Sequence, residues 1–179
     1  GGTSTLTITL QNRTSTPYTD VKFTDTLPGG GNLTIAAAPA PINNCGGTLT
    51  AVAGTNVIQL GTITPGTGGT IPSGTVVTPG TCTIIVTVTS STPGSYPNTI
   101  PANTITSAQG VSNAAAGTAT VTVNAAGPVT VTKAFQTSPI LPGATSRLRI
   151  TITAPSDTGV TGLAISDTLP GDLRIVGNP

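Results

Sequence analysis

Lysine, aspartate and asparagine are the residues of this chain that could together carry out a spontaneous reaction between side chains. A neutral lysine amine can attack an asparagine amide while a nearby carboxyl group carries the protons, and the product is an isopeptide bond. Burial lowers the pKa of a lysine and raises that of an aspartate, which is the direction this reaction needs. Lys133 lies in an apolar segment, Asp25 ends another, and Asn98 and Asn12 are candidate acceptors. The sequence therefore suggests a cross-link among Lys133, Asp25 and Asn98, with Lys133 entering another copy of the chain.

The same residues also have a purely structural interpretation. Lys133 would be an ordinary strand lysine that keeps its ammonium group in water. Asp25 and Asp167 both occur in Asp-Thr-Leu-Pro segments, where an aspartate accepts hydrogen bonds from the backbone of a turn. Asp20 and Asp25 would then be solvated strand ends and not metal ligands.

The rest of the composition argues against catalysis. The 179 residues contain no His and five acidic residues, all of them Asp. Without His there is no ordinary Ser–His or Cys–His pair, and scattered carboxylates form neither an acid–base pair nor a metal cluster. A net charge of +1 is too small to attract nucleic acid or an anionic membrane electrostatically. We therefore expect no enzyme, no cofactor, no metal site, no nucleic-acid partner and no membrane-spanning segment.

Two cysteines, Cys45 and Cys82, stand in a chain that is rich in Thr and only 6% charged. This combination favours a disulfide in an oxidising compartment, with two buried free thiols as the alternative. The chain opens with Gly1-Gly2 and without Met, as expected of a mature fragment or an excised piece. We therefore predict a secreted protein that is extracellular or lies at a cell surface.

Strict alternation of aliphatic and hydroxyl residues is the main structural signal. Period-two alternation places the aliphatic side chains on one face of a strand and predicts half-buried antiparallel strands. Between these segments lie turns such as Thr64-Pro65-Gly66 and Thr92-Pro93-Gly94. Short strands with such turns predict an all-β, antiparallel sandwich of the immunoglobulin-like type. The alternating segments are 6–10, 84–88, 119–123, 129–132 and 148–152.

Two blocks of sequence recur at one distance. Residues 1–10 (GGTSTLTITL) match 143–152 (GATSRLRITI), and residues 23–29 (FTDTLPG) match 165–171 (ISDTLPG). Both pairs are 142 positions apart, so no insertion separates the blocks and the chain contains a tandem repeat of about 142 residues. Residues 1–126 are predicted to form a sandwich repeat without its own first strand. Residues 127–179 then hold the first strands of the next, incomplete repeat.

Six short motifs of the chain form a recognisable set: VTKAF at 131–135, LPGATS at 141–146, SDTLP at 166–170, CGGT at 45–48, GTCT at 80–83 and PGSYPNTI at 93–100. They resemble the conserved Thr-rich repeat domain of large prokaryotic surface proteins. In that family a TKxF strand, a PGxTSTLTITLxN strand, a DTLP turn and paired cysteines follow one another. The resemblance implies an immunoglobulin-like or prealbumin-like sandwich in tandem arrays at the cell surface, serving as stalk, adhesin or wall layer.

The function expected from these features is that of a structural repeat unit in an extracellular filament, stalk or sheath, with copies of itself as partners. The missing first strand of residues 1–126 leaves an open edge that another strand could complete. The strand donor is predicted to be Val129, Val131, Lys133 and Phe135. Two alternatives are an adhesin that binds glycan or protein at a cell surface, and an ice-binding surface made of rows of Thr.

Overall fold

The computed structural model describes residues 2–155 and 160–177, which contain strands and no helix. It divides into two compact units, Gly1–Ala125 and Ala126–Pro179. Gly1, where the first repeated block begins, and residues 156–159 and 178–179 of the second predicted segment lie outside the described residues. The described part of the chain holds no helix of the length and apolar character needed to cross a membrane.

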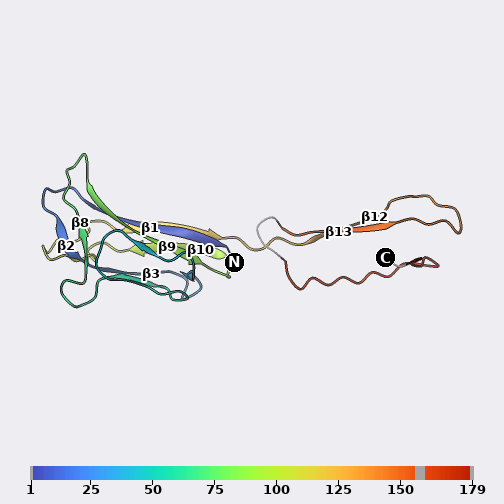
Figure 1. The fold of residues 1–179 in the computed structure, drawn as a ribbon, viewed down its shortest axis with the longest axis horizontal. Coiled ribbons are helices and arrows are strands. Elements are labelled where there is room, and N and C mark those ends of the chain that lie inside the picture. Colours follow the sequence, from blue (N-terminus) through green and yellow to red (C-terminus); the bar gives the residue numbers. More distant parts are fainter. Residues whose placement is uncertain (1, 156–159, 178–179) are drawn as a thin grey trace. The chain divides into compact units, whose positions relative to one another are not determined.

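The first unit is built around the long antiparallel pair of β1 (Thr3–Asn12) and β9 (Gly80–Thr89), which run side by side in Figure 1. Two short strands, β4 (Thr34–Ile35) and β5 (Ile42–Asn43), pair with the other edge of β9. β9 is therefore the central strand of this sheet, whereas β1 stands at its edge.

The remaining strands of the first unit form three smaller antiparallel sheets. One has the order β3-β7-β6, and the other two are the pairs β10-β11 and β2-β8. β10 lies against β3. The strands are β2 (Tyr18–Val21), β3 (Phe23–Thr26), β6 (Leu49–Ala51), β7 (Val57–Leu60), β8 (Gly69–Ile71), β10 (Gly94–Ile100) and β11 (Gly117–Val123).

Alternation along each strand builds one apolar core for the first unit. In β1, Ile8 and Leu10 are buried while Thr7 and Thr9 are exposed. In β9, Ile84 and Val86 are fully buried, because this strand has partners on both edges. The core residues are Ile8, Leu10, Val21, Phe23, Leu27, Leu33, Ile35, Cys45, Ile58, Leu60, Ile71, Cys82, Ile84, Val86, Val88, Tyr96 and Ile100.

The turn after β3 shows why glycine follows Leu27-Pro28. Gly29 has a φ of 88°, and a Cβ atom at this position would lie 2.6 Å from Cε1 of Tyr96. A larger residue would be strained by its backbone and would also displace the Tyr96 ring from the core. The turn Leu27-Pro28-Gly29, which follows β3, is thus packed against β10.

In its described residues the second unit contains one antiparallel hairpin, β12 (Thr130–Phe135) with β13 (Leu148–Thr153). Its side chains are largely exposed: Val131 keeps 57% and Phe135 45% of its accessible surface. In residues 160–177 the structure has no strand. This unit therefore presents apolar strand residues that it does not itself bury.

The sequence prediction of an all-β, antiparallel protein is confirmed. The alternating segments at 6–10, 84–88, 119–123 and 148–152 lie within β1, β9, β11 and β13. One boundary differs, because β12 begins at Thr130 and leaves Val129 just outside the strand.

Candidate functional site

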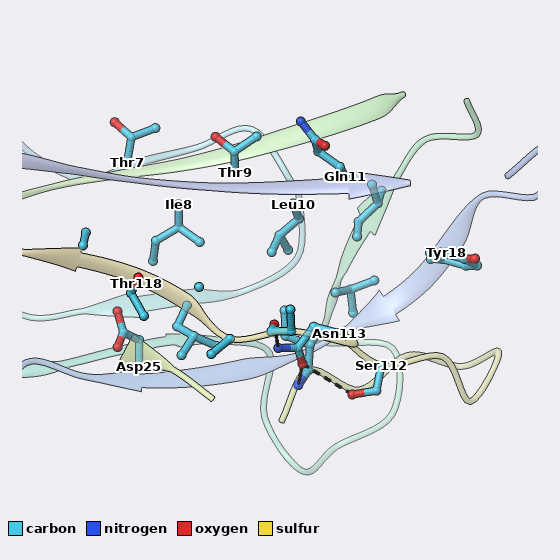
Figure 2. A pocket seen from close by; sticks show the side chains of 18 of the residues that line it. Thr7, Ile8, Thr9, Leu10, Gln11, Tyr18, Asp25, Ser112, Asn113 and Thr118 are labelled. Atoms are coloured by element: carbon cyan, nitrogen blue, oxygen red, sulfur yellow. Dashed lines mark hydrogen bonds between the residues drawn. The ribbon is translucent and has the colours of Figure 1, made fainter. Parts of the chain in front are cut away.

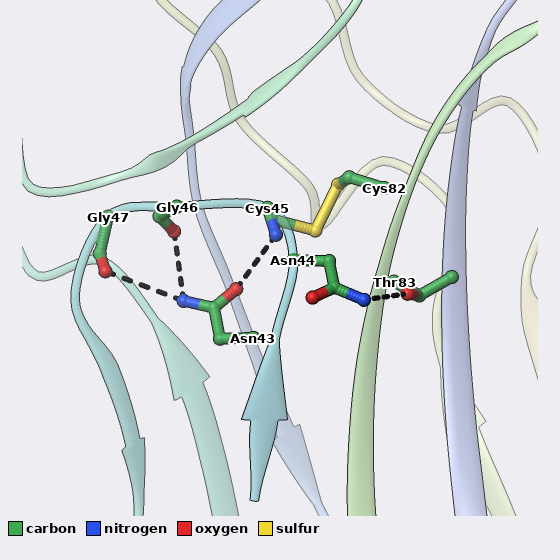
Figure 3. Close-up of a disulfide and its surroundings, with 7 residues drawn as sticks. All are labelled: Asn43, Asn44, Cys45, Gly46, Gly47, Cys82 and Thr83. Atoms are coloured by element: carbon green, nitrogen blue, oxygen red, sulfur yellow. Dashed lines mark hydrogen bonds between the residues drawn. A yellow bond between two sulfur atoms is a disulfide. The ribbon is translucent and has the colours of Figure 1, made fainter.

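The disulfide between Cys45 and Cys82 is confirmed, with sulfur atoms 2.09 Å apart. It links β9 to the turn after β5, and both cysteines are buried in the core (Figure 3). The Asn43 side chain shapes this turn: its Oδ1 accepts a hydrogen bond from the Cys45 N–H, and its Nδ2 donates to the Gly46 carbonyl. The bond therefore fixes a structural corner of the first unit.

A groove of about 340 Å³ runs along β1, and no residue of β9 lines it. One wall is made by residues 6–11 of β1, and part of the other by residues 115–119, which enter β11. Figure 2 shows Ile8 and Leu10 pointing from β1 into this space, whereas Thr7, Thr9 and Gln11 point away from it. The groove is therefore lined by the apolar face of β1.

Both strands that border the groove have an open edge. Within the described residues, β1 hydrogen-bonds only to β9 and β11 only to β10. The backbone N–H and C=O groups along the free edge of an extended strand are ready to pair with a further strand. The groove is thus bordered by two strands that each have a free edge.

Two buried polar side chains, Asp25 and Asn98, line the same groove. Asp25 comes from β3 and is 1% exposed, and Asn98 comes from β10 and is 8% exposed. The Asn98 Nδ2 donates a hydrogen bond of 2.7 Å to Asp25 Oδ2. Within the described residues, Asp25 Oδ1 and Asn98 Oδ1 are buried and have no hydrogen-bond partner. A buried polar atom without a hydrogen-bond partner costs about 1–3 kcal/mol of folding stability. Such atoms are therefore rare in folded proteins, and each one calls for an explanation.

Burial raises the pKa of the Asp25 carboxyl above its ordinary value, and the smaller effect of the hydrogen bond from Asn98 opposes this rise. Among the residues that the structure describes, no charged side chain contributes to the shift. Asp25 is thus a carboxyl that holds its proton more readily than an exposed aspartate does.

The interpretation of Asp25 as a solvated strand end, or as an acceptor for turn backbone, is wrong. Asp25 lies inside β3, where alternation turns it toward the core together with Phe23. Asp20 differs, because it accepts from the Gly68 N–H at 2.9 Å and pairs with Lys22 at 3.0 Å. The Gly68 hydrogen bond first, and then the bond from Lys22, lower the pKa of Asp20.

Lys133 lies in the second unit, on β12, where its Nζ is 2.7 Å from Asp167 Oδ1. The side chain of Lys133 remains 41% exposed. Of the three residues predicted to form the cross-link, the structure thus brings Asp25 and Asn98 together in the first unit. It places the third, Lys133, beside a different aspartate in the second unit.

Asn12, the other candidate acceptor, is held by a turn. Its Oδ1 accepts from the N–H and the hydroxyl of Thr14, and its Nδ2 donates to the Thr16 carbonyl. Because both ends of this buried amide are already bonded, Asn12 has a structural role at the end of β1.

Asn113 is a groove residue that sequence reasoning missed. Its Oδ1 accepts from the N–H groups of Thr104 and Ile105, and its Nδ2 donates to the carbonyls of Pro101 and Ala115. It thereby holds together the two ends of the loop between β10 and β11. A single Asn among so many Ser, Thr and Asn residues carries no sequence signal for this role. The described residues contain no group of three side chains suited to hold a metal ion.

Comparison with known proteins gives one match. A family model described as a domain of unknown function, DUF7933, matches residues 1–123. No curated protein matches the chain, and no solved structure matches it.

Proposed function

The chain belongs to the DUF7933 family of domains of unknown function, and we propose that it is a structural repeat unit of an extracellular filament, stalk or sheath. Copies assemble when the groove beside β1 receives the strand Thr130–Phe135 from another copy. The observation that carries this proposal is the hairpin of the second unit, in which that strand pairs with the sequence counterpart of β1.

The proposed fold is an immunoglobulin-like sandwich in a tandem repeat of about 142 residues. The sheet that contains β1 and β9 and the strands β3, β7 and β10 all contribute to one apolar core. We propose that these strands form two packed layers whose inner faces alternate with polar outer faces. In this proposed fold, the groove is the position that the first strand of the repeat would occupy beside β1.

The hairpin supplies the register of the incoming strand. In the second unit Lys133 pairs with Ile150, which stands 142 positions after Ile8. Phe135 pairs with Leu148, the counterpart of Leu6, and Thr130 pairs with Thr153, the counterpart of Gln11. The counterparts of the paired residues thus run from Leu6 to Gln11, and these are the β1 residues that line the groove.

The side chains match as well as the backbone. Directly opposed residues of an antiparallel pair lie on one face of the sheet. Val131 and Phe135 would therefore enter the groove together with Leu10 and Leu6, and the surface that they expose in the second unit would be buried. Burial of apolar area contributes roughly 25 cal/mol per Å², whereas the backbone hydrogen bonds to β13 are exchanged for equal bonds to β1.

Exchange of this kind between identical copies is a low-cost route to assembly. The chain also carries little charge to keep copies apart, with 6% charged residues and a net charge of +1. The disulfide supports placement in an oxidising compartment such as the cell exterior.

Two neighbouring substitutions on β12 test the strand exchange. Val131→Asp places a charge on the face that enters the groove, whereas Thr132→Asp places the same charge on the opposite face. We expect the unmodified chain and Thr132→Asp to form filaments or multimers, seen by electron microscopy and light scattering. Val131→Asp should remain monomeric.

Equal assembly of the two variants would contradict the proposal, as would an unmodified chain that stays monomeric at every concentration. The extracellular location has a separate test. Protease added to intact cells of the organism that makes the protein should digest it.

A further inference from the structure

We infer that the groove is closed by a covalent bond: an amide between Nζ of Lys133 in one copy and Cγ of Asn98 in the next, with Asp25 as the catalytic proton carrier. The inference rests on the proposed strand exchange and adds a modification site to it. Its basis is that the two units hold complementary parts of one three-residue arrangement.

The second unit shows where a lysine of this strand lies. Lys133 Nζ is 2.7 Å from Asp167 Oδ1, and Asp167 stands 142 positions after Asp25. A Lys133 paired with Ile8 would occupy the same position relative to β1 as it does relative to β13. Ile8 points into the groove that Asp25 lines, so the lysine amine would enter beside the Asp25 carboxyl (Figure 2).

The first unit shows the acceptor next to that carboxyl. Asp25 Oδ2 already accepts a hydrogen bond from the Asn98 amide nitrogen, which would become the leaving group. Asp25 Oδ1 is buried without a partner and can accept a hydrogen bond from the incoming amine. Asn98 Oδ1 is also buried without a partner and is the atom on which negative charge develops during attack. Both unpaired atoms therefore take part in the proposed reaction: Asp25 Oδ1 accepts from the amine, and Asn98 Oδ1 is the oxygen that a proton donor must reach as charge develops.

The reaction balances without any outside reagent. The lysine ammonium gives one proton to the Asp25 carboxylate and becomes a neutral amine. Nζ attacks Asn98 Cγ, and the tetrahedral intermediate passes one Nζ proton, by way of Asp25, to the departing nitrogen. The Cγ–Nδ2 bond breaks, the Nζ–Cγ amide forms and ammonia leaves. The Asp25 carboxyl carries protons between the two nitrogens throughout.

The surroundings favour the neutral forms that this chemistry requires. Asp25 and Asn98 are both buried, and among the described residues no charged side chain contributes to the pKa shift of Asp25. Its pKa is already raised before a strand enters. Closing the groove would remove water further, which disfavours a charged lysine and a charged aspartate alike.

The test uses the full 179-residue chain, boiled under reducing and denaturing conditions and then digested for mass analysis. The unmodified chain should give a ladder of multimers and a branched peptide that joins Lys133 to Asn98 and is lighter by one ammonia. Lys133→Arg keeps the charge and the length of the side chain but cannot react, because a guanidinium stays protonated. Asp25→Asn keeps the shape of the carrier but removes its acidity. Both variants should assemble natively and fall to single chains on boiling.

Lys22→Arg is the matched control, because Lys22 is the other lysine of the chain and pairs with Asp20 outside the groove. It should give the same ladder as the unmodified chain. Native multimers that all dissociate on boiling would overturn the cross-link and leave the strand exchange standing. Absence of any assembly would overturn both. A branched peptide at Lys22, a ladder that persists in Lys133→Arg, or a link confined to single chains would overturn the assignment of residues and partner.

Discussion

The region around β1 and the region around β13 have closely similar sequences and very different surroundings. Ile8 on β1 is 8% exposed, whereas its counterpart Ile150 on β13 is 37% exposed. Asp25 is buried beside Asn98, whereas Asp167 pairs with Lys133 at the surface. β1 has β9 and a core beneath it, while in the part of the chain that the structure describes β13 pairs only with β12. Alternation in the sequence therefore determines which face of a strand can be buried. Segments that are distant in the sequence determine whether that face is buried in the folded chain.

The disulfide between Cys45 and Cys82 is present in the first unit, and the second unit has no cysteine. Its removal should have the largest effect on stability of the changes that compare the two units. Cys45→Ala together with Cys82→Ala should destabilise the first unit by about 3–4 kcal/mol, the expected effect of a loop of 37 residues. Urea unfolding followed by tyrosine fluorescence reports this unit alone, because Tyr18 and Tyr96 both lie in it. The measurement is made in Lys133→Arg, so that no cross-link contributes. A loss below 1 kcal/mol would mean that the core alone holds this corner.

The matched pair Ile8→Ala and Ile150→Ala addresses burial directly. Ile8→Ala should cost about 2–3 kcal/mol, at the low end for buried isoleucine because the side chain borders the groove. Ile150→Ala should change the unfolding of the first unit by less than about 0.5 kcal/mol. Equal costs would show that the two strands have the same surroundings in solution and would remove the contrast.

The two aspartates provide a comparison that depends on pH. The raised pKa of Asp25 means that the folded chain holds this proton more tightly than the unfolded chain. Its contribution to stability is therefore present at low pH and is lost as pH rises above 3.8 and through the folded pKa. In the Lys133→Arg background, Asp25→Asn should raise stability at neutral pH by roughly 1–3 kcal/mol and have no such effect in acid. Denaturant titrations at several pH values measure both, and a gap that widens toward low pH would refute this sign.

Asp167→Asn should have the smallest effect. It removes the ion pair with Lys133 at a partly exposed site, which is worth at most about 1 kcal/mol. Hydrogen exchange of the backbone amides in β12 and β13 should quicken slightly, and tyrosine-detected unfolding should not change. A loss as large as that of Ile8→Ala would show that the pair organises the second unit.

The sequence predicts the strands of this protein better than their partners. Alternation locates β1, β9, β11 and β13, and the Thr-rich, charge-poor composition predicts the disulfide, because both are local or compositional properties. The pair of Asp25 and Asn98 joins residues 73 positions apart on β3 and β10, and it follows from how the sheets pack. The sequence left two interpretations of Asp25 open, a buried carboxyl in a cross-link and a solvated strand end or turn acceptor. Its burial beside Asn98 depends on the position of β10, which no local pattern specifies.

The disulfide between Cys45 and Cys82 also has a mechanical consequence. If the chain serves as the fibre subunit proposed above, tension acts along it, and each subunit that unfolds lengthens the fibre by the extended length of the residues released. The closed loop between the two cysteines cannot be drawn out, which withholds 37 residues, or about 125 Å of extension. If tension opens the first unit, the loop stays shut and keeps its segments close together, ready to refold once the load is removed. A subunit whose disulfide is reduced would stretch further and would take longer to refold.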